Sequence, residues 1–295
     1  MPRDEPVQGC IYLNGTFLAP GEARVSVFDR GFLYGDGVFE SLRTYGGVPF
    51  RLDAHLTRLA SALDEVGIVG VPAPKQLQGI VAETLARAGL PDAYLRITVT
   101  RGTQFEGGPA PRDGLAPTVV VVALPLHGYP AAAYERGVTA VLLWPRAVAD
   151  RPAPAVKSLS FQRGVLGKQQ VVSRGAHEGF YLDGSGHVTE GTTSNVFAVQ
   201  GGALRTPPRE VCLDGVTRRE VLAIARDRGL PAAEAPVTIE SLHAADEVFV
   251  TNSLAELLPV VEIEGRPVGA GLPGPIWRQL WLAYRDACGV GAARA

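Results

Sequence analysis

Lysine, cysteine and methionine are scarce in this chain of 295 residues. It contains one methionine, three cysteines and only three lysines. The cysteines are odd in number and form no CxxC pair, which excludes a regular disulfide framework or a thiolate metal site. The five histidines show no metal-ligand spacing either. Because lysines are so few, each can be considered in turn as a candidate for amine chemistry.

The net charge is small, and long hydrophobic runs are lacking. Lys+Arg total 28 and Asp+Glu total 30, so the chain has no polyelectrolyte signature for nucleic acid or an anionic membrane. The longest apolar run, Thr118–Leu126, is too short to cross a bilayer. Residues 1–5 lack the apolar segment of a signal peptide. These absences favour a cytoplasmic enzyme that binds neither nucleic acid nor membrane.

The N-terminal part of the chain mixes strand and helix patterns. Residues 38–45 and 94–101 alternate with a period of two, so each should form a strand with one polar face and one core-directed face. Apolar stripes at helical spacing follow in 53–66, with Asp53 as the expected N-cap, and in 75–88. This alternation indicates a sheet covered by helices.

The C-terminal part repeats the mixture. Residues 217–220 have the Ser/Thr-x-x-Glu form of a capping box, so Thr217 should begin a helix. Turn-forming residues near 127–130 indicate a domain boundary. The sequence therefore predicts a mixed α/β (α+β) protein with two domains. The expected N-terminal domain, linker and C-terminal domain cover residues 1–126, 127–135 and 136–295.

One lysine and one glutamate together suggest a cofactor. Lys157 follows the apolar, proline-containing stretch 153–156, and burial there would lower the pKa of its amine, as a Schiff-base lysine requires. Glu190 precedes a Gly-Thr-Thr-Ser-Asn loop, where a carboxylate could keep a pyridine nitrogen protonated. Taken singly, each residue is more often a solvated surface group. The pair predicts pyridoxal 5′-phosphate (PLP).

Other residues could hold the phosphate and a substrate carboxylate. The first amides of a helix beginning near Thr217 favour an anion, and Ser253 and Arg58 could complete a phosphate site. Strand faces that carry arginines suit carboxylate recognition, although solvated faces are the alternative. The residues on these faces are Phe39, Ser41 and Arg43 on one strand, and Tyr94 and Arg96 on the other.

In order and spacing, these features resemble the fold-type IV PLP enzymes, the aminotransferase class IV family. The resemblance extends over about residues 11–287 and rests on the following segments: Asp29–Gly31, Tyr34–Glu40, His55–Leu59, Lys157–Leu159, Thr189–Gly191, Ser194–Asn195, Asp214–Arg218 and Asp246–Phe249. It implies two α/β domains with PLP in the cleft between them. It also implies an obligate homodimer, in which Tyr34 reaches the active site of the neighbouring subunit.

The resemblance implies a role for each candidate residue. Lys157 would be the Schiff-base lysine and proton shuttle, and Glu190 the partner of the pyridine nitrogen. The other cofactor-binding residues would be Arg58, Asn195, Val216 through its amide, Thr217 and Ser253. The substrate-binding residues would be Tyr34, Phe39, Arg43, Tyr94, Arg96 and Leu254. The implied reaction is ping-pong transamination between an amino acid and a 2-oxo acid.

Two parts of the sequence favour different substrates. The segment Lys157–Phe161 resembles D-amino-acid transaminases and lyases. However, Glu106 and Gly108 occupy the positions of the D-type Arg-x-His, and the Tyr-x-Arg ending at Arg96 resembles branched-chain enzymes. The leading hypothesis is a D-amino-acid transaminase (D-Ala/D-Glu type) in which Arg96 and Arg43 bind the α-carboxylate. An L-branched-chain transaminase is the alternative, followed by an aminodeoxychorismate lyase or an (R)-amine transaminase. A PLP-binding protein without catalysis stays open as another class.

Overall fold

The structure is a computed structural model that describes residues 7–143 and 156–291. Two sequence features, residues 1–5 and the proline-containing stretch before Val156, lie outside these ranges. The chain divides into two compact units, each described by itself. The first ends at His127 but also includes Val156–Phe161, and the second comprises the remaining residues from Gly128 onward. Lys157 therefore belongs to the first unit, although it follows the predicted linker in sequence.

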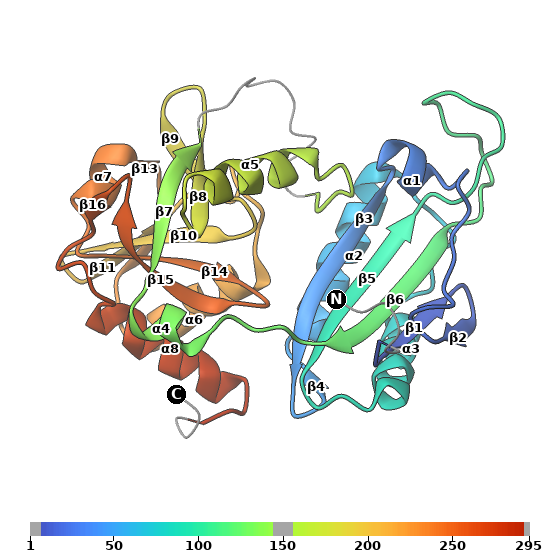
Figure 1. Ribbon diagram of the computed structural model, residues 1–295, viewed down its shortest axis with the longest axis horizontal. Coiled ribbons are helices and arrows are strands. Elements are labelled where there is room, and N and C mark those ends of the chain that lie inside the picture. Colours follow the sequence, from blue (N-terminus) through green and yellow to red (C-terminus); the bar gives the residue numbers. More distant parts are fainter. Residues whose placement is uncertain (1–6, 144–155, 292–295) are drawn as a thin grey trace. The chain divides into compact units, whose positions relative to one another are not determined.

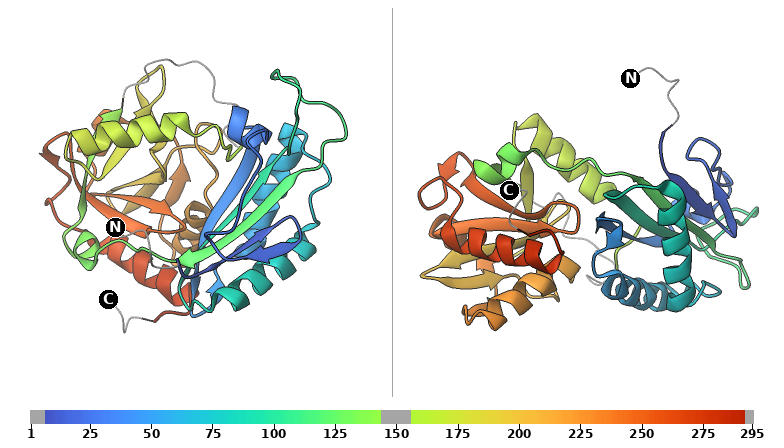
Figure 2. Two further views of the ribbon diagram at one scale, coloured as in Figure 1. Left: turned by 45° about the vertical axis from the view of Figure 1, so that its right-hand side comes forward. Right: turned by 90° about the horizontal axis from the view of Figure 1, so that it is seen from below.

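The first unit is a sheet with two helices on one face (Figures 1 and 2). Its strand order is β2-β1-β6-β5-β3-β4, with every pair antiparallel. The strands are β1 (Cys10–Leu13), β2 (Thr16–Leu18), β3 (Gly37–Tyr45), β4 (Val48–Pro49), β5 (Ala93–Thr100) and β6 (Thr118–Pro125). The helices are α1 (Arg30–Tyr34), α2 (Leu52–Val66) and α3 (Pro74–Ala88).

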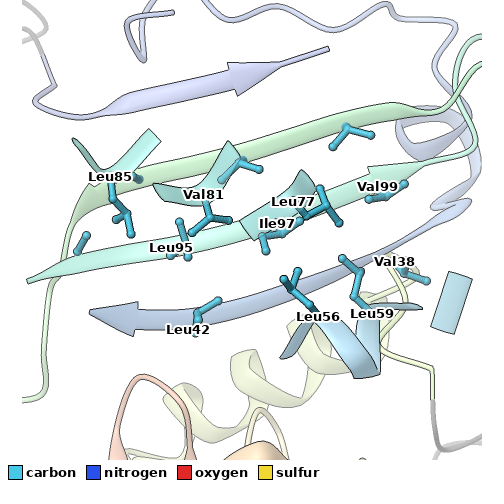
Figure 3. Packing of buried hydrophobic residues seen from close by; sticks show 14 of the residues in the cluster. Val38, Leu42, Leu56, Leu59, Leu77, Val81, Leu85, Leu95, Ile97 and Val99 are labelled. Atoms are coloured by element: carbon cyan, nitrogen blue, oxygen red, sulfur yellow. The ribbon is translucent and has the colours of Figure 1, made fainter. Parts of the chain in front are cut away.

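The core of this unit lies between the sheet and helices α2 and α3. Alternation in β3 and β5 directs every second side chain toward the helices, which contribute their apolar stripes (Figure 3). Each fully buried Leu, Ile or Val contributes about 1.5–3 kcal/mol relative to exposure. The side chains that meet here include Val38, Leu42, Leu56, Leu59, Leu77, Val81, Leu95 and Ile97. The opposite face of β3 and β5 carries arginines and aromatic residues instead.

The beginning of α2 differs from the prediction. The helix begins at Leu52, and its N-cap is Arg51 in the left-handed region at φ 52°. Asp53, predicted as the N-cap, lies inside the first turn instead. Its carboxylate still complements the positive end of the helix dipole there. The predicted end of α3 is confirmed, since Gly89 takes the left-handed conformation (φ 64°) that terminates a helix.

The second unit contains a mixed sheet with helices around it (Figure 1). The strand order is β12-β11-β10-β14-β15-β7-β8-β9-β13, and β16 pairs with β15. Its strands are β7 (Val138–Leu143), β8 (Glu178–Leu182), β9 (His187–Gly191), β10 (Asn195–Gln200), β11 (Ala203–Thr206), β12 (Ala232–Glu234), β13 (Val237–Thr238), β14 (Glu247–Asn252), β15 (Glu256–Ile263) and β16 (Arg266–Pro267). Its helices are α4 (Ala131–Glu135), α5 (Gln162–Ser173), α6 (Val216–Asp227), α7 (Ile239–His243) and α8 (Pro275–Ala287).

The capping box predicted for α6 is wrong. The helix begins at Val216 with Gly215 as its N-cap, and no side chain caps it. Thr217 is therefore the second helical residue. Residues 183–186, whose Asp-Gly-Ser-Gly sequence favours a turn, join β8 to β9, and these two strands pair antiparallel as a hairpin. Within residues 7–143 and 156–291, no helix combines the length and apolarity needed to cross a membrane.

Candidate active site

Main-chain hydrogen bonds hold the Lys157 segment against the beginning of β3, on the strand edge that does not pair with β5. The Phe39 amide donates to the Lys157 carbonyl at 3.0 Å, and the Leu159 amide donates to the Gly37 carbonyl at 2.9 Å. A Cβ on Gly37 would lie 2.7 Å from Leu159 Cδ1 and 2.5 Å from a β5 carbonyl. Glycine is therefore required at position 37 for this segment to approach the strand.

The ring of Phe39 lies beside two cations. Lys157 Nζ is 4.7 Å from the ring centroid, and Arg96 Cζ is 3.8 Å from it. Both distances allow cation–π attraction, which proteins form more often with Arg than with Lys. Strand pairing places Arg43 opposite Tyr94 and Ser41 opposite Arg96, so these residues share one sheet face. The first unit thus brings Lys157 and four predicted substrate residues (Phe39, Arg43, Tyr94 and Arg96) to one region.

Arg58 is fixed by a buried carboxylate on the helix-covered face of the sheet. Its Nε and Nη2 each donate to Glu40 at 2.7 Å, and His55 Nδ1 lies 2.7 Å from Glu40 Oε2. Burial alone would raise the pKa of Glu40, but the charge and hydrogen bonds of Arg58, with a hydrogen bond from His55, lower it to about 2. Burial lowers the pKa of His55, against the effect of Glu40.

Tyr34 has contacts of a different kind. Its hydroxyl accepts a hydrogen bond from the Gly108 amide at 3.2 Å, and the Arg30 guanidinium lies 5.0 Å from its ring centroid. Arg30 also donates to the carbonyls of Gly108 and Pro109. These contacts tie α1 to the loop after β5. Among the described side chains, the structure does not connect Tyr34 with the Phe39 region.

In the second unit, Glu190 and Asn195 hold the same loop residue. Glu190 is buried, and its Oε2 accepts a hydrogen bond from the Leu213 amide at 3.0 Å. Asn195 Nδ2 donates to the Leu213 carbonyl at 2.7 Å. A Cβ on Gly215 would lie 2.0 Å from Asn195 Oδ1, so only glycine permits this approach. These contacts place the beginning of α6 next to Glu190 and Asn195.

The beginning of α6 presents main-chain donors without intrahelical partners. Val216, Thr217 and Arg218 are first-turn residues of a helix that no side chain caps, so their amides make no hydrogen bond within the helix. Thr251 pairs with Asn195 across β14 and β10 and is almost fully buried. Among the described residues, its hydroxyl has no hydrogen-bond partner. The first-turn amides of α6, which make no hydrogen bond within the helix, form an anion-binding arrangement.

The loop between β14 and β15 consists of residues 253–255 and follows Asn252, the last residue of β14. Asn252 Oδ1 accepts hydrogen bonds from the amides of Leu254 at 2.9 Å and Ala255 at 2.7 Å. This turn fixes the backbone on either side of Leu254. Because β14 pairs with β10 at Asn195, Ser253 and Leu254 follow directly from the strand end that adjoins the α6 region.

Sequence reasoning missed a second buried carboxylate, Glu178. It accepts hydrogen bonds from the Thr192 amide at 3.1 Å, from the Thr192 hydroxyl, and from the Ser194 hydroxyl at 2.8 Å. The loop between Glu190 and Asn195 is therefore organised around Glu178. The hydroxyl-rich sequence of that loop was the available signal, but the acceptor comes from a different strand, β8. Glu40 was missed similarly, because only the folded sheet shows its partners.

Comparisons with known proteins identify the family of the chain. The sequence profile of the family described as Amino-transferase class IV matches residues 37–263. The chain belongs to this family. The fold-type IV resemblance and the mixed α/β fold predicted from the sequence are therefore confirmed, and the chain is a PLP-dependent aminotransferase.

Three relatives show how closely this class IV aminotransferase is matched. A protein of Methanocaldococcus jannaschii with the provisional name branched-chain-amino-acid aminotransferase is 41% identical over 279 residues, 94% of this chain and 95% of the relative. A D-alanine aminotransferase of Bacillus licheniformis is 33% identical over 287 residues, 94% and 96% of the two chains. A solved branched-chain amino acid aminotransferase of T.th., with pyridoxamine 5′-phosphate, has a TM-score of 0.90 and 31% identity, covering 98% and 97% of the two chains.

Proposed function

We propose that this class IV aminotransferase transfers the amino group of L-branched-chain amino acids to a 2-oxo acid. The observation that carries the proposal is the Phe39 region, where the Lys157 amine and the Arg96 guanidinium lie beside one aromatic ring. A fixed guanidinium near an amine suits a substrate whose carboxylate and amino group share one carbon. The higher identity to the branched-chain relative favours this substrate class over D-alanine.

The residues of the second unit fit a phosphate-bearing pyridine cofactor. The first-turn amides of α6 suit a phosphate, and Gly215 lets Asn195 pack against the beginning of that helix. The unpartnered, buried hydroxyl of Thr251 adds a donor near the same strand end. Glu190 offers a buried carboxylate whose orientation the Leu213 amide fixes. When bound, PLP supplies an aldehyde for the amino group and a ring that accepts the electron pair released at Cα.

The chain's own residues then have distinct tasks. Lys157 Nζ takes the proton from the substrate Cα and returns it later in the half-reaction. Glu190 keeps a proton on the ring nitrogen. Arg96 orients the α-carboxylate, and Arg58, held by Glu40, contributes positive charge toward the phosphate together with Val216, Thr217 and Ser253. Asn195 keeps the α6 loop in position through Leu213.

A D-amino-acid transaminase is the second candidate, and it led the sequence-based hypotheses. Its support is the segment Lys157–Phe161 and the 33% identity to a D-alanine aminotransferase. The loop after β5 argues against it. Glu106 there pairs with Arg112 on the surface, and Gly108 contacts Tyr34, so the positions of the D-type Arg-x-His hold neither side chain. The carboxylate of a D-substrate would have to be bound by other residues.

Stereospecific assays test the proposal. The purified protein with PLP is given L-leucine or D-alanine as donor and 2-oxoglutarate as acceptor, and 2-oxo acid formation is measured. We expect turnover of L-leucine at least tenfold above D-alanine, a difference of about 1.4 kcal/mol in transition-state binding. The reverse preference would establish the D-specific alternative. Glu190→Gln, which keeps the side-chain shape without the charge, should retain PLP but lose most transaminase activity.

We also propose a homodimer as the active form. Phe32 in α1 and Phe105 in the loop after β5 are 71% and 75% exposed, and Phe105 contacts the half-exposed Phe28 with ring centroids 5.4 Å apart. Large apolar residues grouped on a surface are typical of an interaction site. Light scattering of the purified protein should give twice the chain mass of 31.2 kDa.

A further inference from the structure

The loop that joins β14 to β15 is held by three aromatic side chains. Each of three consecutive residues accepts one hydrogen bond from a different ring: the Ala255 carbonyl from Tyr134 Oη at 3.0 Å, Glu256 Oε2 from Trp281 Nε1 at 2.9 Å, and the Leu257 carbonyl from Trp277 Nε1 at 3.2 Å. Tyr134 comes from α4 and both tryptophans come from α8, which runs beside this hairpin (Figure 1).

The three rings form one stack. The Tyr134 and Trp281 rings have centroids 5.2 Å apart with 14° between their planes, and Trp277 and Trp281 are 5.3 Å apart at 11°. Both tryptophans are buried. Because the rings pack face to face, moving one donor requires displacing its neighbours.

The helix that carries the tryptophans is anchored to the same hairpin. The amides of Ile276 and Trp277, in the first turn of α8, donate to the two carboxylate oxygens of Glu247 at 2.9 and 2.7 Å. Glu247 is the first residue of β14. A Cβ on Gly274 would lie 2.0 Å from the Glu247 carboxylate carbon, so the helix begins in direct contact with the strand. The α8 donors therefore keep a fixed position relative to the hairpin.

Glu256 adopts a backbone conformation that needs such support. Its φ is 58°, in the left-handed region that non-glycine residues adopt only at a cost. Glu256 directly follows the three-residue loop 253–255 and pairs with Asn252, although glycine, asparagine and aspartate are the residues that usually adopt a left-handed conformation. The hydrogen bond from Trp281 and an ion pair with Arg285 at 4.0 Å hold its buried carboxylate.

We propose that Trp281 is a positioning residue, which holds Glu256 in the left-handed conformation and thereby sets the geometry of Ser253 and Leu254. Tyr134 and Trp277 support it within the stack. The inference rests on the proposed function, in which Ser253 contacts the cofactor phosphate and Leu254 the substrate. Trp281 itself touches neither group. Its effect reaches the reaction only through the hairpin.

The test begins with Trp281→Phe, which keeps an aromatic ring and removes the donor to Glu256. The matched control is Trp277→Phe, an equal truncation in the same stack that affects only a main-chain acceptor within β15. For Trp281→Phe we expect faster hydrogen exchange at the Leu254 and Ala255 amides, and weaker PLP retention. The KM for the amino acid should rise about tenfold while kcat changes less than about twofold, because the displaced Leu254 weakens substrate binding and leaves the reacting groups in place. Trp277→Phe should lower the Tm by a similar amount but leave hydrogen exchange at the Leu254 and Ala255 amides nearly unchanged.

A second substitution separates positioning from packing. Asparagine accepts the left-handed region more readily than glutamate and does not leave the same buried carboxylate unpaired. In a Glu256→Asn background, Trp281→Phe should therefore change KM less than about twofold. Equal exchange rates in the Trp281 and Trp277 variants, or an unchanged tenfold effect in the Asn background, would overturn the proposal. Wild-type protein without transaminase activity would instead refute the proposed function, while the exchange measurement would still decide the role of Trp281.

Discussion

Replacing Glu40 with Gln tests the buried ion pair that fixes Arg58. Glu40 is 1% exposed and accepts two hydrogen bonds from Arg58 and one from His55. Its pKa of about 2, against an ordinary value of 4.5, corresponds to about 3 kcal/mol of stabilisation. Removing one partner of a buried pair costs about 3–5 kcal/mol, which agrees in order of magnitude. We expect Glu40→Gln to lower the Tm at pH 7 by about 6–12 °C.

The matched control is Glu83→Gln. Glu83 pairs with Arg87 at 2.7 Å on the surface of α3, where both side chains are about half exposed. Such a pair contributes about 0.3–0.5 kcal/mol, so the Tm should fall by no more than about 2 °C. Thermal unfolding followed by circular dichroism measures both variants under identical conditions. If Glu40→Gln lowered the Tm by no more than Glu83→Gln does, the reasoning would be refuted.

The pH dependence provides an independent check. The pKa of Glu40 is lowered in the folded protein, so its stabilisation is complete above the unfolded value near 4.5 and is lost as the pH falls toward 2. The Tm difference between wild type and Glu40→Gln should therefore shrink between pH 4.5 and 2. The pKa of His55 is lowered as well, so its own contribution begins to decline below its unfolded value near 6.5. A constant Tm difference down to pH 2 would contradict the assignment to Glu40.

Three further substitutions follow from the structure. In steady-state assays, Arg96→Ala should raise the KM for the amino acid by about 10–100-fold, because a charged hydrogen bond to the substrate carboxylate is lost. Arg112 is exposed, and Arg112→Ala should leave this KM unchanged. Glu178→Gln should lower unfolding stability by about 1–3 kcal/mol in urea titrations, since Thr192 and Ser194 lose a charged acceptor; an unchanged midpoint would contradict this role. Phe105→Ser should weaken the proposed dimer, and light scattering that still shows only dimer at low concentration would count against that surface.

Most regular elements of the fold were predictable from the sequence. Residues 38–45 and 94–101 alternate so regularly that only a half-polar strand fits, and Gly89 ends α3 because glycine alone adopts its backbone freely. The predicted caps failed at Asp53 and Thr217. In both cases the backbone turns before the expected residue, at Arg51 and Gly215, and side-chain type alone does not reveal that conformation.

The candidate site was predictable to a different degree. The resemblance of its motifs identified the family, which the comparisons confirm, and it selected Lys157 and Glu190; their roles stay predictions. The buried partners that orient the site were not predictable. Glu40 and Glu178 bind groups from other elements, and such contacts have no periodic signal in the chain. Substrate handedness also stayed open, because the segment after Lys157 and the strand at Arg96 favour different relatives.

By itself, the sequence determined the family, the chemistry that a scarce lysine and a nearby carboxylate make available, and the faces of the strands. These follow from local rules of spacing and side-chain type. The tertiary structure alone decided which buried charges are paired, where α6 begins, and how the stack of Tyr134, Trp277 and Trp281 holds the β14–β15 loop. The reason is that each depends on groups far apart in sequence, whose distances exist only after the chain has folded.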